Sequence, residues 1–381
     1  MTRMFAALLT CAITAAAPAL ARSPEPIPAS GESKPQPVIQ IAVLLDTSNS
    51  MDGLISQAKS QLWKLVNEFA RARYSGRAPR LEVALYEYGN DRLSAKNGFL
   101  RKVSDLTTDL DRVSEQLHGL RTSGGDEFCG EVIDAATREL EWRSGKGTLK
   151  MIFIAGNEPF NQGDVDYQAA IKRAISKGIT VNTIFCGSEQ EGIRSGWKQG
   201  ALLADGRYAF IDSNRRVAHV VAPQDAELAQ LGQKLNETYV GYGARGTEAK
   251  ARQAREDRNA LSAGQGAGVN RALAKAKDQY RAEDWDLVDA TAGGRAMAAV
   301  APAALPVEMQ AMDETARQAF VAEKAKERDQ IRGRMQKLEA QRRAYVAAEQ
   351  KKRAASGAAT LDGAILDSLQ EQAARASFSL E

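Results

Sequence analysis

The sequence is poor in the residues on which most enzyme sites are built. Its 381 residues include only two histidines, His118 and His219, and three cysteines. Two histidines are too few for a histidine metal cluster, and a serine or cysteine triad would need one of them beside a nucleophile. We expect both to be surface or helix-capping residues. The chain also contains no phosphate-binding loop and no Cys-x-x-Cys motif, so neither nucleotide nor dithiol chemistry is indicated.

Long apolar runs and a strong net charge are missing as well. Beyond the first residues, no apolar run approaches the roughly 18 to 20 residues that span a bilayer. The formal net charge is only +3, so the chain as a whole has no strong electrostatic attraction for nucleic acid. We therefore expect neither a transmembrane segment in the mature chain nor a nucleic acid partner.

The start of the chain has the pattern of a secretory signal. Within residues 1–21, Arg3 precedes an apolar stretch, and Ala19-Leu20-Ala21 offers a small-residue cleavage site. A lipoprotein signal ending at Cys11 is the alternative, but its preceding threonine fits that pattern poorly. We expect cleavage near Ala21 and export to the periplasm or out of the cell, with a proline-rich linker over residues 22–37.

An exported chain would keep two cysteines, Cys129 and Cys186, in an oxidising compartment. Cys129 opens a predicted helix and Cys186 ends a predicted strand, so both lie near the same end of the predicted sheet. An even number of cysteines in such a compartment favours a disulfide. We predict a bridge between Cys129 and Cys186, with two buried free thiols as the alternative.

Strand and helix patterns alternate from residue 38 to residue 240. Apolar or mixed runs predict strands over residues 39–46, 81–86, 98–103, 149–155, 180–186 and 207–211. Helical spacing of apolar residues predicts helices over residues 54–72, 110–120, 131–142, 167–176, 193–203 and 226–239, the last of them closing the domain. This alternation is typical of an α/β fold, a doubly wound, mostly parallel sheet of six strands.

The most informative stretch runs from Ile39 to Asp52 and reads Ile-Gln-Ile-Ala-Val-Leu-Leu-Asp-Thr-Ser-Asn-Ser-Met-Asp. Its apolar first half predicts a strand buried on both faces of a parallel sheet. Asp46, Ser48 and Ser50 follow, where the carboxyl ends of strands border the ligand crevice of an open α/β sheet. A carboxylate and two hydroxyls are hard oxygen donors, which suit Mg²⁺ or Ca²⁺ better than Zn²⁺. These residues are candidate metal ligands, and capping of the next helix is the alternative.

This motif, its strand and the following helix resemble the von Willebrand factor A (VWA) domain family. In that family the same motif opens the metal-ion-dependent adhesion site. The resemblance covers residues 38–240, roughly half of the chain. It implies a Rossmann-like sheet, a bound divalent cation, and capture of an acidic group of a partner protein at the vacant metal position.

The rest of the metal site fits the resemblance only in part. The family places a threonine after the paired glycines of the second loop and an aspartate at the end of the fourth strand. Here the first position is Asp126, a carboxylate that can bind a metal or hold a water for it, and the second is Gly156. Other oxygen donors lie nearby: Thr122 and Ser123 in the loop, and Asn157 and Glu158 after the strand. We take as candidate ligands Asp46, Ser48, Ser50 and Asp126.

Residues 241–381 differ in composition from the first half. β-Branched residues thin out while Ala, Arg, Glu, Gln and Lys dominate, which favours long helices. Residues 309–353 could form one helix with a coiled coil, a helical hairpin, or an arm that packs on the sheet domain. Coiled-coil spacing is kept by Ile331, Met335, Leu338 and Tyr345, but it is interrupted by Arg342, with Lys324 and Arg328 at the upstream positions.

The same region carries a basic stretch and two apolar clusters. Residues 321–353 hold eleven Lys or Arg against five Asp or Glu. A solvated helix face, or contact with an acidic partner or an anionic envelope surface, would explain this excess. The apolar clusters are Trp285, Leu287 and Val288, and Leu361, Ile365 and Leu369. We predict that they pack on each other or on the sheet domain.

These patterns together favour an exported protein-interaction module that is not an enzyme. Its VWA-like domain would bind an acidic group of a partner protein through Mg²⁺ or Ca²⁺. A metal-free structural scaffold of the cell envelope is the alternative. A haloacid-dehalogenase-like phosphatase would also place an aspartate at Asp46, but those enzymes carry a second aspartate where this chain has Ser48.

Overall fold

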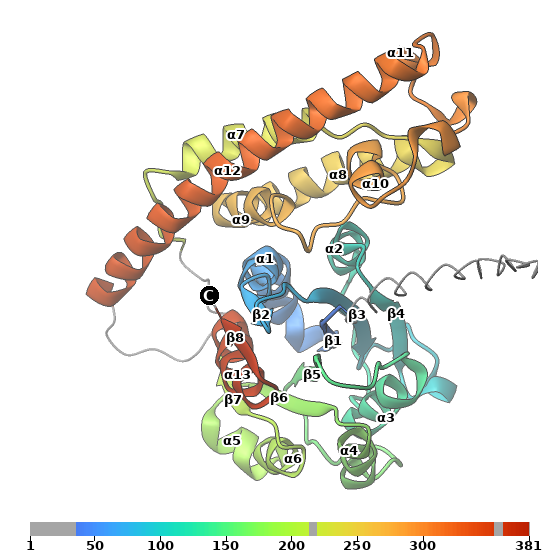
Figure 1. The fold of residues 1–381 in the computed structure, drawn as a ribbon. Coiled ribbons are helices and arrows are strands. Elements are labelled where there is room, and N and C mark those ends of the chain that lie inside the picture. Colours follow the sequence, from blue (N-terminus) through green and yellow to red (C-terminus); the bar gives the residue numbers. More distant parts are fainter. Residues whose placement is uncertain (1–35, 213–218, 354–360, 381) are drawn as a thin grey trace, which may run out of the picture. The chain divides into compact units, whose positions relative to one another are not determined.

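A mostly parallel sheet forms the centre of the structure, a computed structural model that describes residues 36–212, 219–353 and 361–380. Among these residues, six strands pair in the order β4-β3-β1-β5-β6-β7 (Figure 1). They are β1 (Val38–Asp46), β3 (Arg80–Tyr88), β4 (Leu100–Thr107), β5 (Thr148–Gly156), β6 (Thr180–Cys186) and β7 (Tyr208–Ile211). All neighbours run parallel except β3 and β4. The predicted fold class is therefore confirmed.

Helices cover both faces of the sheet because β1 carries apolar side chains on both. Ile39 and Ile41 pack into one core, whereas Ala42 and Leu44 pack into the other. The first face is covered by α1 (Asp52–Phe69), α2 (Leu110–Gly119) and α13 (Leu361–Arg375). The second face is covered by α3 (Cys129–Glu139), α4 (Tyr167–Ser176) and α6 (Trp197–Leu203), next to α5 (Glu189–Arg194).

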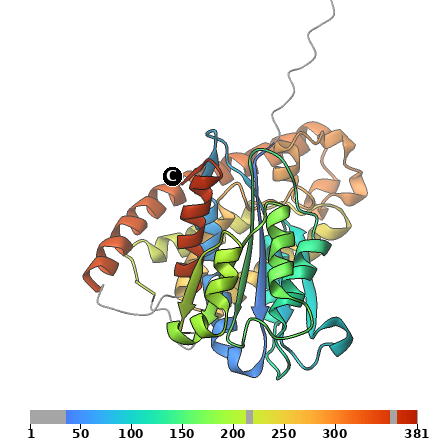
Figure 2. The ribbon, with the colours of Figure 1, turned by 90° about the horizontal axis from the view of Figure 1, so that it is seen from below.

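The helix that completes the first face comes from the C-terminal end of the chain. The sequence predicts that residues 226–239 close the domain, and α7 (Asp225–Glu237) does form there, but it packs on other helices. Instead α13 lies against α1 and the strands β5 to β7 (Figure 2). Ile365 and Leu369 of α13 enter the core of the sheet, as predicted, and the side chain of Leu361 lies outside the described residues.

Polar contacts fix α13 in this position. The amide nitrogen of Asn182 on β6 donates to the side-chain oxygen of Gln372 at 3.2 Å, and both side chains are buried. Arg207 forms ion pairs with Asp367 and Glu371. The chain then adds β8 (Phe378–Leu380), which pairs antiparallel with β2 (Ala72–Tyr74) in a separate two-stranded sheet.

The remaining helices form a second layer beside α1 and α2. They are α8 (Gly243–Ser262), α9 (Gln265–Lys275), α10 (Leu287–Ala292), α11 (Val307–Gln310) and α12 (Glu314–Arg353). Short 3-10 turns are η1 (Asn49–Met51), η2 (Ala95–Asn97), η3 (Met297–Ala299) and η4 (Pro302–Ala304). The residues from Gln36 onward belong to one compact unit, across the division that the sequence predicts at residue 240. None of the described helices combines the length and apolarity needed to cross a bilayer.

Helix α12 is one 40-residue helix, as the sequence suggests, and it packs within its own chain. Ile331, Met335 and Leu338 bury their side chains against residues of α7 and α9. The apolar side chains that suggested a coiled coil are thus covered by other helices of the same chain. The prediction for the first apolar cluster was wrong, because Leu287 and Val288 pack neither on the second cluster nor on the sheet. They form a separate core with residues of α11 and α12.

Several cations that break the coiled-coil spacing meet acidic partners in the same layer. Arg328 is 1% exposed and pairs with Asp286 at 2.8 Å and Asp289 at 2.6 Å. Arg342 pairs with Asp225 at 2.6 Å. Part of the basic excess of this helix therefore serves to attach α12 to the layer.

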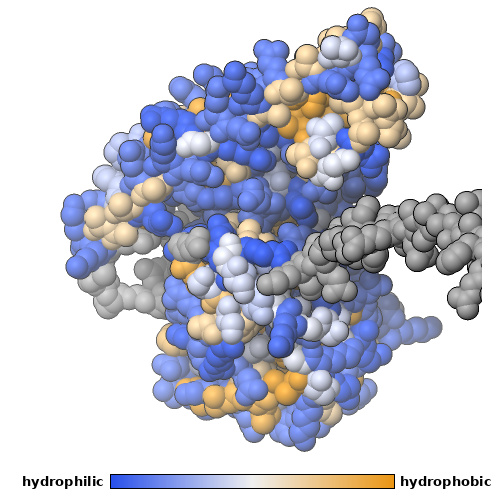
Figure 3. All heavy atoms as spheres, viewed as in Figure 1, coloured by the Kyte–Doolittle hydropathy of each residue, from blue (hydrophilic) through white to orange (hydrophobic). Residues whose placement is uncertain are grey.

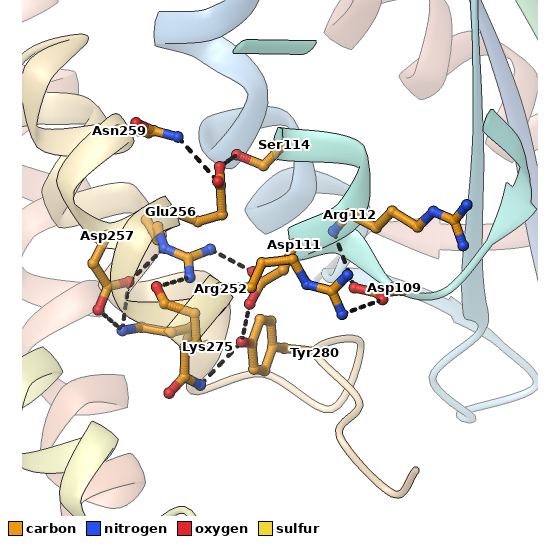
Figure 4. A network of polar contacts seen from close by, with 12 residues as sticks. Asp109, Asp111, Arg112, Ser114, Arg252, Glu256, Asp257, Asn259, Lys275 and Tyr280 are labelled. Atoms are coloured by element: carbon orange, nitrogen blue, oxygen red, sulfur yellow. Dashed lines mark hydrogen bonds and ion pairs between the residues drawn. The ribbon is translucent and has the colours of Figure 1, made fainter. Parts of the chain in front are cut away.

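A buried polar network joins this layer to the sheet domain (Figure 4). Arg271 of α9 is 1% exposed, pairs with Asp111 of α2 at 2.7 Å and with Asp257 of α8 at 2.5 Å, and lies 4.5 Å above the ring of Trp63. Tyr280 donates to Asp111 at 2.6 Å. Because buried charges need partners, these contacts hold α8 and α9 in one position against α1 and α2.

A chain that ends at Arg353 tests the role of α13. Without α13, apolar residues of the first face such as Ile184 and Ile211 lose their cover, so we expect a lower melting temperature and strong binding of a dye for exposed apolar surface. Circular dichroism melting and dye fluorescence, with the full chain as control, measure both. Equal melting and equal dye binding would contradict the role assigned to α13.

Candidate metal centre

The candidate ligands lie at the carboxyl end of the central strand. β1 ends at Asp46, between the parallel neighbours β3 and β5, and the turn η1 then leads into α1 at Asp52. The chain passes from β1 to β3 on one side of it and later crosses from β4 to β5 on the other side, so the strand order reverses here. Such a point is where open α/β sheets bind ligands. The fold therefore places the motif where the sequence predicts it.

Asp46, Ser48 and Ser50 are brought together by the turn. Asp46 is fully buried, and one carboxylate oxygen, Oδ1, accepts a hydrogen bond of 2.7 Å from the backbone N–H of Ser48. The other oxygen, Oδ2, is buried and has no hydrogen-bond partner. The hydroxyls of Ser48 and Ser50 lie 3.2 Å apart, and Asn157 donates its amide to Ser50 at 3.2 Å. A buried carboxylate oxygen is thus left unsatisfied beside two hydroxyls.

In the loop before α3, the buried carboxylate is that of Glu127 and not that of Asp126, which the sequence indicated. Asp126 is exposed at the rim, whereas Glu127 is only 8% exposed and lies with Asp46 around the backbone of Gly89. Thr122 donates its hydroxyl to Asp52, and Ser123 donates its backbone N–H to the carbonyl of Thr47 at 2.9 Å. The only signal for Glu127 in the sequence is its place directly after Asp126.

β5, which is the fourth strand of the family pattern, has no room for the aspartate that the pattern places at its end. A Cβ atom at Gly156 would lie 2.4 Å from the hydroxyl oxygen of Tyr88 and 3.1 Å from Oδ2 of Asp46. Tyr88 is buried and donates to the carbonyl of Ala155 at 3.0 Å. The glycine is therefore required by Tyr88, which fills the space.

Burial alters the acidity of both inner carboxyls. Burial raises the pKa of Asp46 to about 7, against the opposing effect of its hydrogen bonds with Ser48. Burial also raises the pKa of Glu127 to about 7, and the nearby charges of Asp46 and Glu158 raise it further. Two adjacent buried carboxylates and an unsatisfied oxygen are what a cation would stabilise.

The oxygen donors at the site suit a hard cation, but the carboxylates alone are too few to hold it. Within the described ranges, no three His, Cys, Asp or Glu residues are grouped so that they could hold a metal ion by themselves. Any ion here would rely on the serine hydroxyls and on water as well as carboxylates. Mg²⁺ and Ca²⁺ accept such mixed oxygen ligands.

The predicted bridge between Cys129 and Cys186 is absent, because both cysteines are buried free thiols. The side chain of Cys129 belongs to the core between the sheet and α3, whereas that of Cys186 belongs to the core on the opposite face. The sheet separates the two sulfurs, so the alternative of two buried thiols holds in this structure.

The comparison with known families adds to this geometry. Residues 40–248 match the family model of the von Willebrand factor type A domain. The chain belongs to this family. VWA domains are generally interaction modules, and they commonly bind a divalent metal at the adhesion site. No curated protein matches the chain.

The solved structures that resemble this chain include three from different sources. BatB from Bacteroides thetaiotaomicron is 18% identical, with 46% of this chain and 90% of that chain covered and a TM-score of 0.35. The SpRpn10 VWA domain is 15% identical, with 46% and 88% covered and a TM-score of 0.35. Proximal thread matrix protein 1 from the mussel byssus, with a zinc-occupied adhesion site, is 13% identical, with 46% and 42% covered and a TM-score of 0.35.

Acidification in EDTA tests the buried carboxyls. Unfolded, these groups titrate near their ordinary pKa values of 3.8 and 4.5, but in the folded chain both pKa values are about 7. The folded state alone takes up protons as the pH falls through 7, so stability is gained from about pH 7.5 down to about pH 4.5. We expect Asp46→Asn to reduce this gain in melting temperature. An equal gain in wild type and variant would contradict the raised pKa of Asp46.

Proposed function

We propose that the chain is an exported protein-interaction module that captures an acidic group of its partner through a divalent cation. The observation that carries this proposal is the buried Oδ2 of Asp46, which has no hydrogen-bond partner and faces Gly156 at the end of β5. An unsatisfied carboxylate in that position costs free energy unless a cation or a proton compensates it. Membership of the VWA family supports the cation.

Asp46, Ser48 and Ser50 would hold Mg²⁺ or Ca²⁺, with Asp126 at the rim able to hold a water of the ion. The bound cation would supply a positive charge at the mouth of the crevice, to which a carboxylate of the partner binds. The protein residues supply orientation, because the backbone N–H of Ser48 fixes Asp46 and Asn157 fixes Ser50. This division of roles requires no catalytic group.

Exposed apolar side chains on α5 and α6 favour a protein as the partner. Only the start of α6 borders the site, since the indole nitrogen of Trp197 donates to the carbonyl of Glu158 at 2.7 Å. The end of α6, with Leu202 and Leu203, leads to the start of β7. On α5 and α6, Ile193, Leu202 and Leu203 are 38%, 67% and 44% exposed. Figure 3 shows hydrophobic surface at the lower end of the molecule, where these helices lie. Exposed apolar residues of this kind mark interaction surfaces.

Export and an envelope contact belong to the same proposal. The predicted signal over residues 1–21 and almost all of the linker over residues 22–37 lie outside the described residues. Helix α12 exposes several cations on its outer side, among them Lys326, Lys337 and Lys351. An anionic envelope surface would attract them.

A metal-free scaffold is the second candidate. The lack, among the described residues, of three grouped metal-binding side chains favours it. The buried networks around Arg271 and Arg328 would suit a rigid platform equally well.

Melting in different ions separates the two candidates. In wild type, Mg²⁺ or Ca²⁺ at about a hundredfold above Kd should raise the free energy of unfolding by ~2.7 kcal/mol relative to EDTA, because the ion binds only the folded state. Asp46→Ala should show no response, and its melting in EDTA confirms that it folds. Identical wild-type melting in Mg²⁺, Ca²⁺ and EDTA would exclude the cation and leave the scaffold.

A further inference from the structure

The proposed cation site needs more negative charge than Asp46 alone provides. The family pattern pairs the first-strand aspartate with a second one at the fourth strand, but that position is Gly156 and its space is filled by the hydroxyl of Tyr88. With Asp46 alone, one negative charge would face a divalent ion. The exposed Asp126 lies at the rim, outside the buried part of the site. A second inner carboxylate is therefore needed from elsewhere.

We propose that Glu127 supplies this second carboxylate, in place of the missing aspartate at position 156 and instead of Asp126. Glu127 is 8% exposed, and its side chain lies with that of Asp46 around the backbone of Gly89. It thus lies on the inner side of the crevice with the motif. This assignment rests on the proposed cation.

Gly89 shows how close the two carboxylates lie. A Cβ atom at Gly89 would be 2.6 Å from Cγ of Glu127 and 2.9 Å from Oδ1 of Asp46. Both side chains therefore approach the same point of the backbone, at the end of β3. The residue has φ +74°, which a glycine adopts without strain. Any side chain at this position would push the two carboxylates out of place.

The loop that carries Glu127 is held by backbone contacts. The N–H of Ser123 donates to the carbonyl of Thr47, and the N–H of Asp91 donates to the carbonyl of Gly124. A Cβ atom at Gly125 would lie 2.7 Å from the backbone nitrogen of Asp91, so the loop fits tightly against the end of β3. Glu127 is thus positioned by the fold before any ion binds, which reduces the cost of ordering a ligand.

This position of Glu127 also leaves the outer side of the ion for the partner. Asp46 and Glu127 together neutralise one divalent cation, as two aspartates would. Neither side chain is exposed, so both lie on the inner side and a carboxylate from outside can approach the ion. Asp126 then acts only at the rim, on the long-range electrostatics of approach.

Isothermal titration of the full chain with MgCl₂ and with CaCl₂ tests the assignment, using Glu127→Gln and its exposed neighbour Asp126→Asn as a matched pair. Glu127→Gln should weaken the Kd for the ion about tenfold or more, equivalent to ~1.4 kcal/mol. Asp126→Asn should change Kd less than about twofold, because the exposed charge is screened. Circular dichroism in EDTA checks that each variant folds; if Glu127→Gln does not, Glu127→Asp takes its place with the same expected loss.

A rescue variant distinguishes a ligand from a merely structural residue. Tyr88→Phe removes the hydroxyl that blocks position 156, so Tyr88→Phe with Gly156→Asp makes room for the family's aspartate. Added to Glu127→Gln, this pair should restore most of the lost affinity. A loss that the rescue leaves unchanged would indicate that Glu127 only shapes the loop, and would overturn its assignment as a ligand.

The outcomes separate the two proposals. Weaker binding in Asp126→Asn, with Glu127→Gln unchanged, would overturn the assignment of Glu127 while leaving the cation-dependent function intact. A wild-type chain that binds neither ion would end the proposed function and this assignment together.

Discussion

The parallel pairing of β1 with both β3 and β5 is the constraint on which the rest of the structure depends. It places β1 at the centre of the sheet, where helices cover both faces, so the polar residues of the motif lie at its carboxyl end. There the strand order reverses, and Asp46 is fully buried with one oxygen unsatisfied. Tyr88 fills the space beside Gly156, and Gly89 leaves room for Glu127. The composition of the site therefore follows from the packing around one strand.

The rest of the chain is built onto this domain and does not form a separate tail. The helices α7 to α12 lie in the sequence between β7 and α13, and α13 returns to cover the face that α1 shares. Buried ion pairs of Arg271 and Arg328 hold the layer in place. Because isolated buried charges are costly, each pair permits one arrangement of its helices and disfavours others. The candidate metal site lies at the edge of the sheet, where β1 and its neighbours end.

The sequence predicts the sheet well because apolar runs and helical spacing record which faces are buried. The motif around Asp46 is predictable for the same reason, since it follows directly on such a run. The placement of α13 could not be predicted, because amphipathic helices such as α7 and α13 offer similar apolar faces and only tertiary contacts decide between them. Glu127 and the Cys129–Cys186 pair depend on which way a side chain points from a loop or a strand. The local sequence pattern does not determine the direction in which such a side chain points in the folded protein.

The central claim is that a divalent cation binds at Asp46, Ser48 and Ser50. Anomalous diffraction from crystals grown with Mn²⁺, a hard divalent ion that accepts the same oxygen donors as Mg²⁺, tests it most directly. We predict one strong anomalous peak within bonding distance of the two serine hydroxyls and beside the carboxylate of Asp46. A crystal of the folded chain at saturating Mn²⁺ with no peak in this crevice would contradict the account.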